Sequence, residues 1–334
     1  MGVNLRDIIS AKEIKLNDLS GKTIGIDACN WTYQFLSTIR LRTGELLTDS
    51  KGRVTSHLIG MFNRTVNLLA AGIKPCYVWD GKPPELKRKT IEAREKVKQA
   101  AQKSFDRAET EEEKRRFAQQ LSRLTPDMIN DANKMLELMG VPHFKAPGEG
   151  EAQISHIVNK KEFWACASQD WDSLLFGSNL LIRNLSISGK KRVPRTKIFK
   201  TVNPEIIDLH ENLHRLGLSR EQLVILGVLV GTDYSAGVKG LGPKKSLALV
   251  QKEKTLENIK KAAKFEDDFE EVINLFLKPK VTDDYSIEWK EIEKEKLLKL
   301  LVDEHNFSQE RVESQLKSLE EKTDKKQTGL HKFF

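Results

Sequence analysis

Short apolar runs rich in β-branched and aromatic residues recur along the chain, and each predicts a buried strand. They read KTIGIDAC (22–29), KPCYVWDG (74–81), VPHFKA (141–146), FWACASQD (163–170) and NLLIRNL (179–185). Between these runs, apolar residues spaced for one helical face predict helices over 57–72, 125–140 and 150–161, of which the first two end at a glycine. Strands that alternate with helices predict an α/β fold: a mostly parallel, twisted sheet with helices on both faces.

A highly charged helical pattern from 85 to 120 interrupts this alternation. Its apolar positions recur at helical spacing but form only a thin stripe, so we expect exposed helices that project from the sheet. Residues 85–103 hold seven basic side chains against three acidic ones. Most charge runs are only solvated surface. The position of this one, directly after a strand that ends in Asp80, favours a functional role.

The segment 218–234 (LSREQLVILGVLVGTDY) predicts a buried helix that stops at Gly231. The next residues, GVKGLGPKKSLALV, place Gly237 and Gly242 at the spacing of a phosphate-binding P-loop. Pro243 stands where that loop needs lysine, and a helix precedes the loop instead of a strand, which excludes this interpretation.

The alternative interpretation of the same residues is a glycine hairpin between two helices. Its free backbone amides and the following helix N-terminus can bind a nucleic-acid phosphate, with help from Lys239, Lys244 and Lys245. After 290, two further helical patterns with leucine-rich faces lead to the terminal sequence QTGLHKFF.

Composition bounds the class of protein. With 334 residues and a hydrophobic fraction of 39%, the chain can form one large domain with appendages, or two domains. It has neither a membrane-length apolar stretch nor the features of a signal peptide, so we expect a soluble intracellular protein. Cys29, Cys76 and Cys166 lie in apolar runs and in no metal-binding pair, which is typical of reduced core residues.

The net charge is +8, which is compatible with a polyanionic partner. Against this basic background, acidic residues stand at the ends of apolar runs. Asp27 follows TIGI, Asp80 follows CYVW, and Asp170 follows ACASQ. In open parallel sheets, ligands bind beyond the carboxyl ends of the strands, so we expect these three carboxylates to converge.

Asp170 and Asp172 flank a single tryptophan. If both lay on a strand, their side chains would point the same way. Two carboxylates about 4 Å apart repel by roughly 4 kcal/mol at an effective dielectric of about 20, unless a cation lies between them. This pair therefore predicts a metal ion.

Further carboxylates occur where structure alone does not require them. Glu149 and Glu151 lie in the glycine-interrupted turn PGEGEA, and Asp233 follows a helix. Taken singly, Asp27, Glu149 or Glu151 could cap a helix, and Asp233 could be an ordinary turn residue. All candidate metal ligands together are Asp27, Asp80, Glu149, Glu151, Asp170, Asp172 and Asp233.

Oxygen ligands without histidine or cysteine favour Mg²⁺ or Mn²⁺ over zinc. Seven carboxylates can hold two such ions, which is the arrangement that enzymes use for phosphodiester hydrolysis. Lys87 and Arg94, seven residues apart on one helical face, are placed to bind the scissile phosphate, and Tyr33 could stack on a base.

The motifs IGIDA, VWDGKPPELK, APGEGEAQ, ASQDWDSLLFG and GTDY, followed by GVKGLGPKKS, together resemble the flap endonucleases, the structure-specific 5′ nucleases of replication and repair. The resemblance spans nearly the whole chain in the family's order. It implies a PIN-like α/β nuclease core, a helical arch, a C-terminal DNA-binding region of helix-hairpin-helix type, and cleavage where a 5′ single strand leaves duplex DNA. Exonuclease activity from 5′ to 3′ is expected as well.

The resemblance also implies roles for single residues. Asp27, Asp80, Glu149 and Glu151 would serve one Mg²⁺, and Asp170, Asp172 and Asp233 the other, with Mn²⁺ as a substitute and Asp170 counted with Lys87 and Arg94 as catalytic. Lys87, Arg94, Tyr33 and Gly2, the last near the active site once Met1 is removed, would contact DNA. So would Lys239, Gly240, Gly242, Lys244 and Lys245 in the hairpin, which would also hold K⁺.

The terminal QTGLHKFF resembles the family's sliding-clamp-binding motif, with Gln327, Leu330, Phe333 and Phe334 as anchors. The chain stops at this motif and so resembles an archaeal member, a monomer at the nucleoid in the cytoplasm. The domain boundaries that follow are 1–84 and 125–217 for the two parts of the nuclease core, 85–124 for the arch, 218–320 for the helical DNA-binding region and 321–334 for a flexible tail.

Two other functions remain open from the sequence. A catalytically idle DNA-junction-binding protein would keep the shape, although all seven carboxylates are present. An RNA-directed nuclease of the same architecture would differ in its response to 2′-hydroxyl groups.

Overall fold

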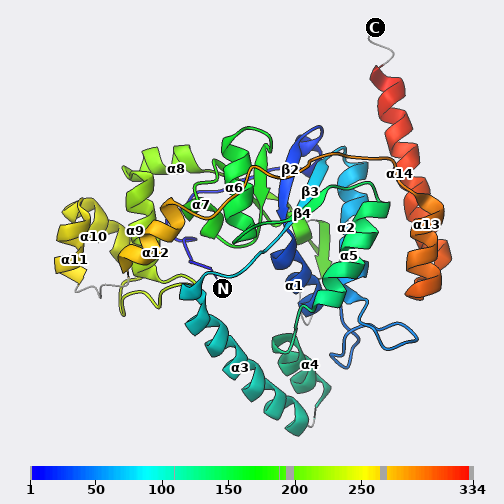
Figure 1. Cartoon of the computed structure of the whole chain (residues 1–334), viewed down its shortest axis with the longest axis horizontal. Helices are drawn as coiled ribbons and strands as arrows, with labels where there is room; N and C mark the ends of the chain where they lie inside the picture. The colour runs from blue at the N-terminus through cyan, green and yellow to red at the C-terminus, as the bar shows by residue number, and fades with distance from the viewer. Residues whose placement is uncertain (1, 109, 188, 193–198, 264–268, 331–334) are drawn as a thin grey trace.

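The computed structural model describes residues 2–108, 110–187, 189–192, 199–263 and 269–330. A seven-stranded sheet crosses the middle of the molecule, and helices cover both of its faces (Figure 1). In spatial order its strands are β1 (Lys12–Glu13), β9 (Glu205–Asp208), β6 (Leu180–Arg183), β5 (Ala165–Ala167), β2 (Thr23–Asp27), β3 (Lys74–Trp79) and β4 (His143–Lys145). The α/β fold class predicted from the sequence is confirmed.

The sheet is parallel from β6 through β4, whereas β9 pairs antiparallel with both β6 and β1. This antiparallel edge was not predicted. A separate antiparallel pair, β7 (Gly189–Arg192) and β8 (Phe199–Val202), was also not predicted.

Alternate residues of the central strands face opposite sides of the sheet, as strand geometry requires. On β3, Cys76 and Val78 belong to one buried cluster, while Tyr77 and Trp79 belong to the other. The first cluster is completed by α6 (Gly150–Asn159), α7 (Asp172–Leu175), α8 (Leu209–Leu216), α9 (Arg220–Val230), α10 (Pro243–Glu253), α11 (Leu256–Ala263) and α12 (Phe269–Leu277). The second is completed by α1 (Ala28–Thr38), α2 (Ser56–Ala70), α5 (Pro126–Leu138), α13 (Lys294–Leu298), the π-helical η4 (Lys299–Glu304) and α14 (Gln309–Leu330).

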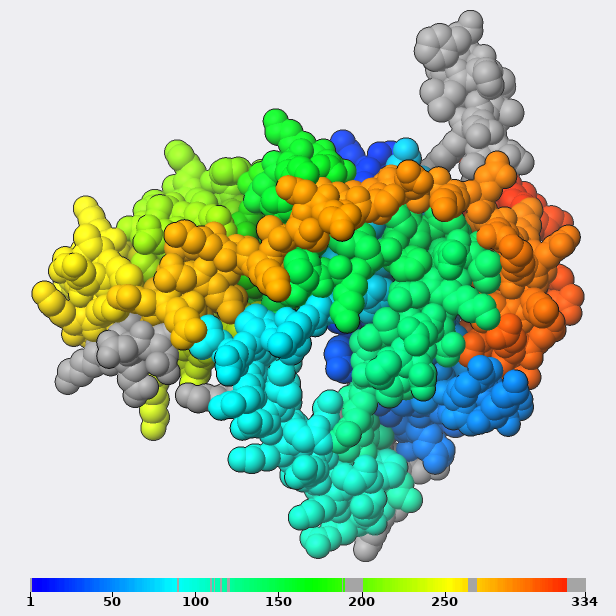
Figure 2. Space-filling model, viewed as in Figure 1, coloured from blue at the N-terminus to red at the C-terminus, as the bar shows by residue number. Residues whose placement is uncertain are grey.

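Two helices project from the core, where the thin apolar stripe predicted them (Figure 1). They are α3 (Arg88–Arg107), preceded by the 3-10 turn η2 (Glu85–Lys87), and α4 (Glu111–Gln120). Figure 2 shows an opening between these helices and the core. Where the arch returns to the core after α4, the Arg40 guanidinium donates to Ser122 Oγ at 2.8 Å and to the Gly44 carbonyl at 2.6 Å. Two more 3-10 turns, η1 (Leu16–Leu19) and η3 (Leu185–Ile187), lie within the core region.

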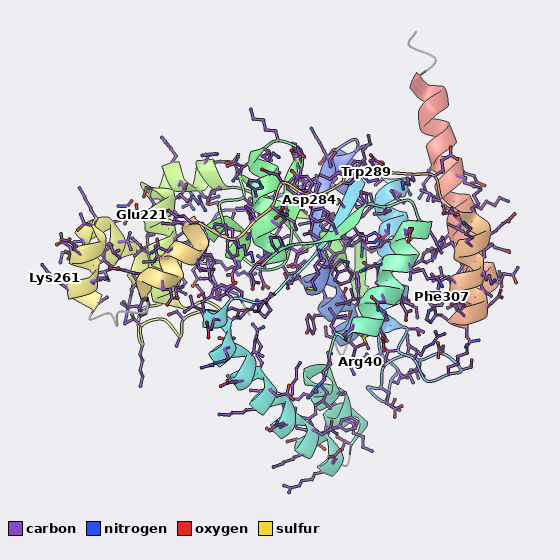
Figure 3. All side chains as sticks on the ribbon, viewed as in Figure 1. Arg40, Glu221, Lys261, Asp284, Trp289 and Phe307 are labelled. Carbon is purple, nitrogen blue, oxygen red and sulfur yellow. The ribbon has the colours of Figure 1, made fainter. Side chains whose placement is uncertain are left out.

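Residues 278–293 form an extended strap, without helix or strand, that crosses the molecule from α12 to α13 (Figure 1). Trp289, labelled in Figure 3, donates from Nε1 to the Pro75 carbonyl at 2.9 Å. Near the other end of the strap, Gln153 Nε2 donates to the Thr282 carbonyl at 2.7 Å. These bonds hold the strap against the nuclease core.

The strap leads to one correction about the C-terminal third. The range 218–320 was expected to be one helical DNA-binding region, but α13 packs on α5 and α14 packs on α2 in the second cluster, on the face of the sheet opposite α9–α12. For the range 321–334, expected to be a flexible tail, the structure describes α14 as far as Leu330, and residues 331–334 lie outside the described residues. No helix among the described residues is long and apolar enough to cross a membrane.

Candidate active site

The carboxyl ends of neighbouring strands meet at one edge of the sheet. β2 pairs with β3 on one side and β5 on the other, so Ile26 lies beside both Tyr77 and Ala167. Asp27 is the last residue of β2, and Asp80 directly follows β3. The sheet itself therefore brings these two carboxylates together, as the sequence predicted.

Asp170 and Asp172 do not lie on a strand, and this expectation was wrong. β5 ends at Ala167, Asp170 lies in the loop that follows, and Asp172 is the first residue of α7. The chain leaves the sheet because the Asp170 backbone amide donates to Ser168 Oγ at 3.2 Å, a local turn that replaces strand pairing. The two carboxylates still interact, since the charge of Asp170 contributes to the raised pKa of Asp172, which is mainly due to burial.

The PGEGEA turn brings two more carboxylates to the same place. Glu149 occupies the N-cap position of α6, but its side chain makes no capping bond, so helix capping does not explain it. The Gly150 amide donates to Asp80 Oδ1 at 2.7 Å, and a Cβ atom at this glycine would lie 3.0 Å from the same oxygen. Glu151 Oε1 accepts a hydrogen bond from Ser173 Oγ at 2.6 Å.

The base of the arch reaches the remaining carboxylate, Asp233, in the turn after α9. Arg94 Nη2 lies 2.6 Å from both carboxylate oxygens of Asp233, and Thr90 Oγ1 donates to its backbone carbonyl at 2.6 Å. Lys87 Nζ donates to Glu149 Oε2 at 2.7 Å and lies 3.9 Å from Asp233 Oδ2. The two basic residues predicted on one helical face thus point to the same carboxylate.

One cleft of about 1510 Å³ collects these groups. Its lining includes all seven predicted carboxylates: Asp27, Asp80, Glu149, Glu151, Asp170, Asp172 and Asp233. It also includes Tyr33, Lys87, Arg94 and Lys239. The cleft therefore has an acidic centre that lies beneath a basic arch.

Burial makes this concentration of charge unfavourable. It raises the pKa of Asp27 and Glu151 well above the ordinary range, and neighbouring carboxylates add to the effect. It raises the pKa of Asp172 to about 7 and also raises that of Glu149. Asp233 differs, because nearby positive charge, including Arg94, holds its pKa below the usual value despite burial.

These observations test whether the cleft fits a divalent cation. The donors are all carboxylate oxygens, the chemistry that Mg²⁺ and Mn²⁺ prefer. Their mutual repulsion would be relieved by a cation, and in this structure Lys87 and Arg94 supply positive charge instead. As the side chains stand, no three acidic, histidine or cysteine groups in the described part of the chain converge closely enough to hold an ion. The donor set fits, and ion binding would require the carboxylate side chains to move closer together.

Two predicted DNA-contacting residues lie at this cleft. Tyr33, on α1, lines it and is 43% exposed, so its ring is accessible to a ligand. Gly2 lies against Asp172: a Cβ atom at Gly2 would be 2.6 Å from Asp172 Oδ1. The next residue, Val3, donates its amide to the same oxygen at 2.7 Å.

The predicted glycine hairpin lies between α9 and α10. Gly237 and Gly240 have φ angles of +71° and +88°, a backbone conformation that favours glycine. Gly242 is the N-cap of α10 and leaves its first amides without a capping side chain. Lys239, Lys244 and Lys245 are exposed around this turn.

Only part of the predicted clamp-binding motif lies within the described residues. Gln327 and Leu330 belong to the last turns of α14, but their side chains lie outside the described residues, as do Phe333 and Phe334 entirely.

Three cleft residues were missed or misread in the sequence. Cys29, expected in the core, is half-buried and lines the cleft. Tyr234 also lines the cleft, and its ring packs edge-on against Phe276 at 5.4 Å between centroids. Asn30 hydrogen-bonds to two candidate ligands. The available signal was proximity in sequence, since each is a polar or aromatic residue within three positions of Asp27 or Asp233.

Comparison with known proteins agrees with this geometry. The model for the XPG N-terminal domain matches residues 1–101, and that for the XPG I-region matches residues 140–233. The chain is 48% identical to flap endonuclease 1 of Staphylothermus marinus over 349 aligned positions, which cover 100% of each chain. It is also 48% identical to flap endonuclease 1 of Pyrococcus horikoshii, over 96% of this chain and 94% of that one.

Solved structures give the same result. Flap endonuclease-1 from Methanococcus jannaschii superposes with a TM-score of 0.76 at 36% identity, covering 97% of this chain and 100% of that one. The catalytic core of Rad2 in complex with a DNA substrate superposes with a TM-score of 0.74 at 26% identity, covering 96% and 100%. The chain belongs to the flap endonuclease 1 family, whose members are metal-dependent nucleases that hydrolyse phosphodiester bonds.

Proposed function

We propose that this protein cleaves 5′ single-stranded flaps where they leave duplex DNA, during Okazaki-fragment maturation and repair, with two Mg²⁺ ions bound by the seven carboxylates. The observation that carries the proposal is that all seven line one cleft beneath a basic arch. Bound in pairs, such ions activate water and stabilise both oxygens of a phosphodiester displacement. Mn²⁺ has the same ligand preference and is expected to substitute.

The chain's own residues position the DNA. Lys87 and Arg94 face the carboxylates and would exchange those partners for the scissile phosphate, while Tyr33 stacks on an adjacent base. The opening beneath the arch (Figure 2) would admit the 5′ strand. A side chain at position 2 would clash with Asp172, which occupies the space beside Gly2.

Duplex DNA would bind at the glycine hairpin. The exposed Lys239, Lys244 and Lys245 neutralise phosphate charge, and Gly240 and Gly242 let the backbone approach it closely. A K⁺ ion is expected at this turn. The C-terminal anchors Gln327, Leu330, Phe333 and Phe334 would bind a sliding clamp, and the protein would act as a monomer at the nucleoid, in the cytoplasm.

One experiment tests the reaction. End-labelled 5′-flap, nicked and blunt duplex DNA are incubated with Mg²⁺ or with chelator, and the products are sized. We expect cleavage at the flap junction that chelator abolishes. Cleavage of all three substrates alike, or activity in chelator, would contradict the proposal.

Variants separate catalysis from binding. Asp170→Asn should reduce cleavage to background while flap binding persists. Asp284→Asn, an exposed carboxylate on the strap (Figure 3), is the matched control and should cleave normally. An inactive parent that still binds flaps would support the junction-binding alternative. Faster cleavage of RNA flaps than of matched DNA flaps would support the RNA-directed one.

A further inference from the structure

Asn30, in the first turn of α1, connects two of the candidate metal ligands. Its backbone amide donates to Asp27 Oδ1 at 2.9 Å, and its side-chain Nδ2 donates to Asp170 Oδ2 at 3.0 Å. Asp27 ends a strand of the sheet, whereas Asp170 lies in a loop 140 residues away from Asn30 in sequence. Ser168 also links the two, since its Oγ donates to Asp27 Oδ2 at 3.2 Å and accepts from the Asp170 backbone amide, but only Asn30, among the described residues, links Asp27 to the carboxylate of Asp170.

The orientation of the Asn30 amide is determined by its neighbours. Its Oδ1 accepts from the Gln169 backbone amide at 3.4 Å, while Nδ2 faces the Asp170 carboxylate. A flipped amide would place an acceptor against a carboxylate and leave a donor facing a donor. Both ends of the side chain thus hold the loop that carries Asp170.

The other restraints on this loop hold its backbone and its neighbouring side chains, such as Gln169, whose Nε2 donates to Ser186 Oγ at 3.1 Å. The Asp170 backbone bonds to Ser168 Oγ, and Arg183 Nε donates to the Gln169 carbonyl at 3.2 Å, but neither bond reaches the carboxylate. Among the described residues, Asn30 is the one side chain that hydrogen-bonds to the Asp170 carboxylate. It does so at Oδ2, which leaves Oδ1 available to a cation.

We propose that Asn30 is a positioning residue, which sets the orientation of Asp170 relative to Asp27 and thereby the affinity of the cleft for its divalent cations. The inference rests on the proposed function, because it assigns both aspartates to metal binding. Residues that orient metal ligands through hydrogen bonds typically change metal affinity or activity by about 10- to 100-fold when they are removed. A solvent-facing asparagine in a first helical turn would have no such effect.

The test measures metal binding without substrate. Mn²⁺ is titrated into the DNA-free protein and followed by electron paramagnetic resonance. We expect Asn30→Ala to weaken Mn²⁺ binding by about 10- to 100-fold. In cleavage assays the Mg²⁺ concentration for half-maximal rate should rise by a similar factor, with KM for flap DNA unchanged.

Controls separate this role from folding. Asn63→Ala removes a comparable side-chain amide on α2. The Oδ1 atom of Asn63 accepts a hydrogen bond from Gln315 Nε2 at 2.7 Å. This variant should bind Mn²⁺ like the parent. Asn30→Leu keeps the size of the side chain but removes both of its hydrogen-bonding groups. If Asn30→Ala folds poorly, Asn30→Leu tests the same expected loss of Mn²⁺ affinity.

The outcomes distinguish failure of the positioning role from failure of the metal assignment. If the parent binds Mn²⁺ and either Asn30 variant binds it equally well, the positioning role is overturned. Equal weakening in Asn63→Ala would overturn it too, because the effect would then be general. If the parent itself binds no Mn²⁺, the metal assignment of the proposed function fails, and this inference fails with it.

Discussion

Lys87 Nζ donates a hydrogen bond to Glu149 Oε2 at 2.7 Å, so the base of the arch is in direct contact with the carboxylate cluster. Although burial opposes it, Glu149 raises the pKa of Lys87, and the ammonium group stays charged. The Lys87 ammonium group, held at the cleft, can exchange its carboxylate partner for a substrate phosphate.

Removing the positive charge of Lys87 or Arg94 should lower the cleavage rate more than it weakens DNA binding. We expect Lys87→Ala and Arg94→Ala each to lower the single-turnover cleavage rate by about 100-fold, because a preorganised cation at the reacting phosphate is lost. Single-turnover cleavage of a 5′-flap substrate measures the change. Arg88→Ala is the matched control, since Arg88 is 72% exposed on the same helix and pairs only locally with Glu92. Unchanged turnover in the two test variants would mean that the arch is only a solvated face.

The strap yields a prediction about stability. Gly140 and Gly217 have nearly equal φ angles of +66° and +62°, so alanine at either costs about 1 kcal/mol of backbone strain. At Gly140, however, a Cβ atom would lie 2.0 Å from the Lys290 carbonyl oxygen, whereas at Gly217 it would meet nothing within 4 Å. Gly140→Ala should therefore lower the free energy of unfolding by a further amount of about 1 to 3 kcal/mol.

Chemical unfolding of the two variants checks this difference. Gly217→Ala acts as the control for backbone strain, and the excess loss in Gly140→Ala reports the contact between α5 and the strap. Equal losses in the two variants would show that the strap moves aside without cost.

The sequence predicted those parts of the site that regular structure positions. Asp27 and Asp80 were placed correctly because each directly ends a long apolar run, and parallel strands align such ends. Arg94 and Lys87 both reach the cleft as expected, although Lys87 ends the 3-10 turn η2 and only Arg94 lies within α3. Residues 85–120 projected as expected because their apolar stripe is too thin to be buried.

The remainder depended on tertiary contacts that leave no periodic signal. β1 has only two residues, both charged, and β9 reads EIID, too short for alternation to be recognised. The loop at Asp170 resembled a continued strand because Trp171 extends the apolar run, yet this ring is buried under the Arg183 guanidinium, 4.1 Å from its centroid. The strap has no periodic pattern, since it is held by single contacts to separate elements, such as Trp289 to the Pro75 carbonyl and Thr282 to the Gln153 side chain.

The proposed clamp-binding residues at the C-terminus predict a function that can be separated from cleavage. Deleting residues 327–334 should weaken binding to an archaeal sliding clamp by at least about tenfold, because the apolar anchors carry most of such interfaces. Cleavage without the clamp should not change, since α14 packs on α2 well before this point, through Leu316 and Leu319. Calorimetry with purified clamp and a clamp-free cleavage assay measure the two effects. Clamp binding that survives the deletion would place the interface elsewhere.

Buried His57 predicts how stability depends on pH. Burial, reinforced by the charge of His305, lowers the pKa of His57 to about 4 from an ordinary value of 6.5. Between these values the unfolded chain binds a proton that the folded protein does not. Stability is therefore fully present above pH 6.5 and is lost as the pH falls toward 4, by about 3 kcal/mol in total.

The comparison of parent with His57→Gln isolates this effect. The carboxylates with raised pKa act in the opposite direction, since they are destabilising when charged, but they are present in both proteins. We expect the parent to lose more free energy of unfolding than His57→Gln between about pH 7 and pH 4, as measured by chemical unfolding at intermediate steps. Parallel curves for the two proteins would show that His57 is protonated in the folded state as readily as in the unfolded chain.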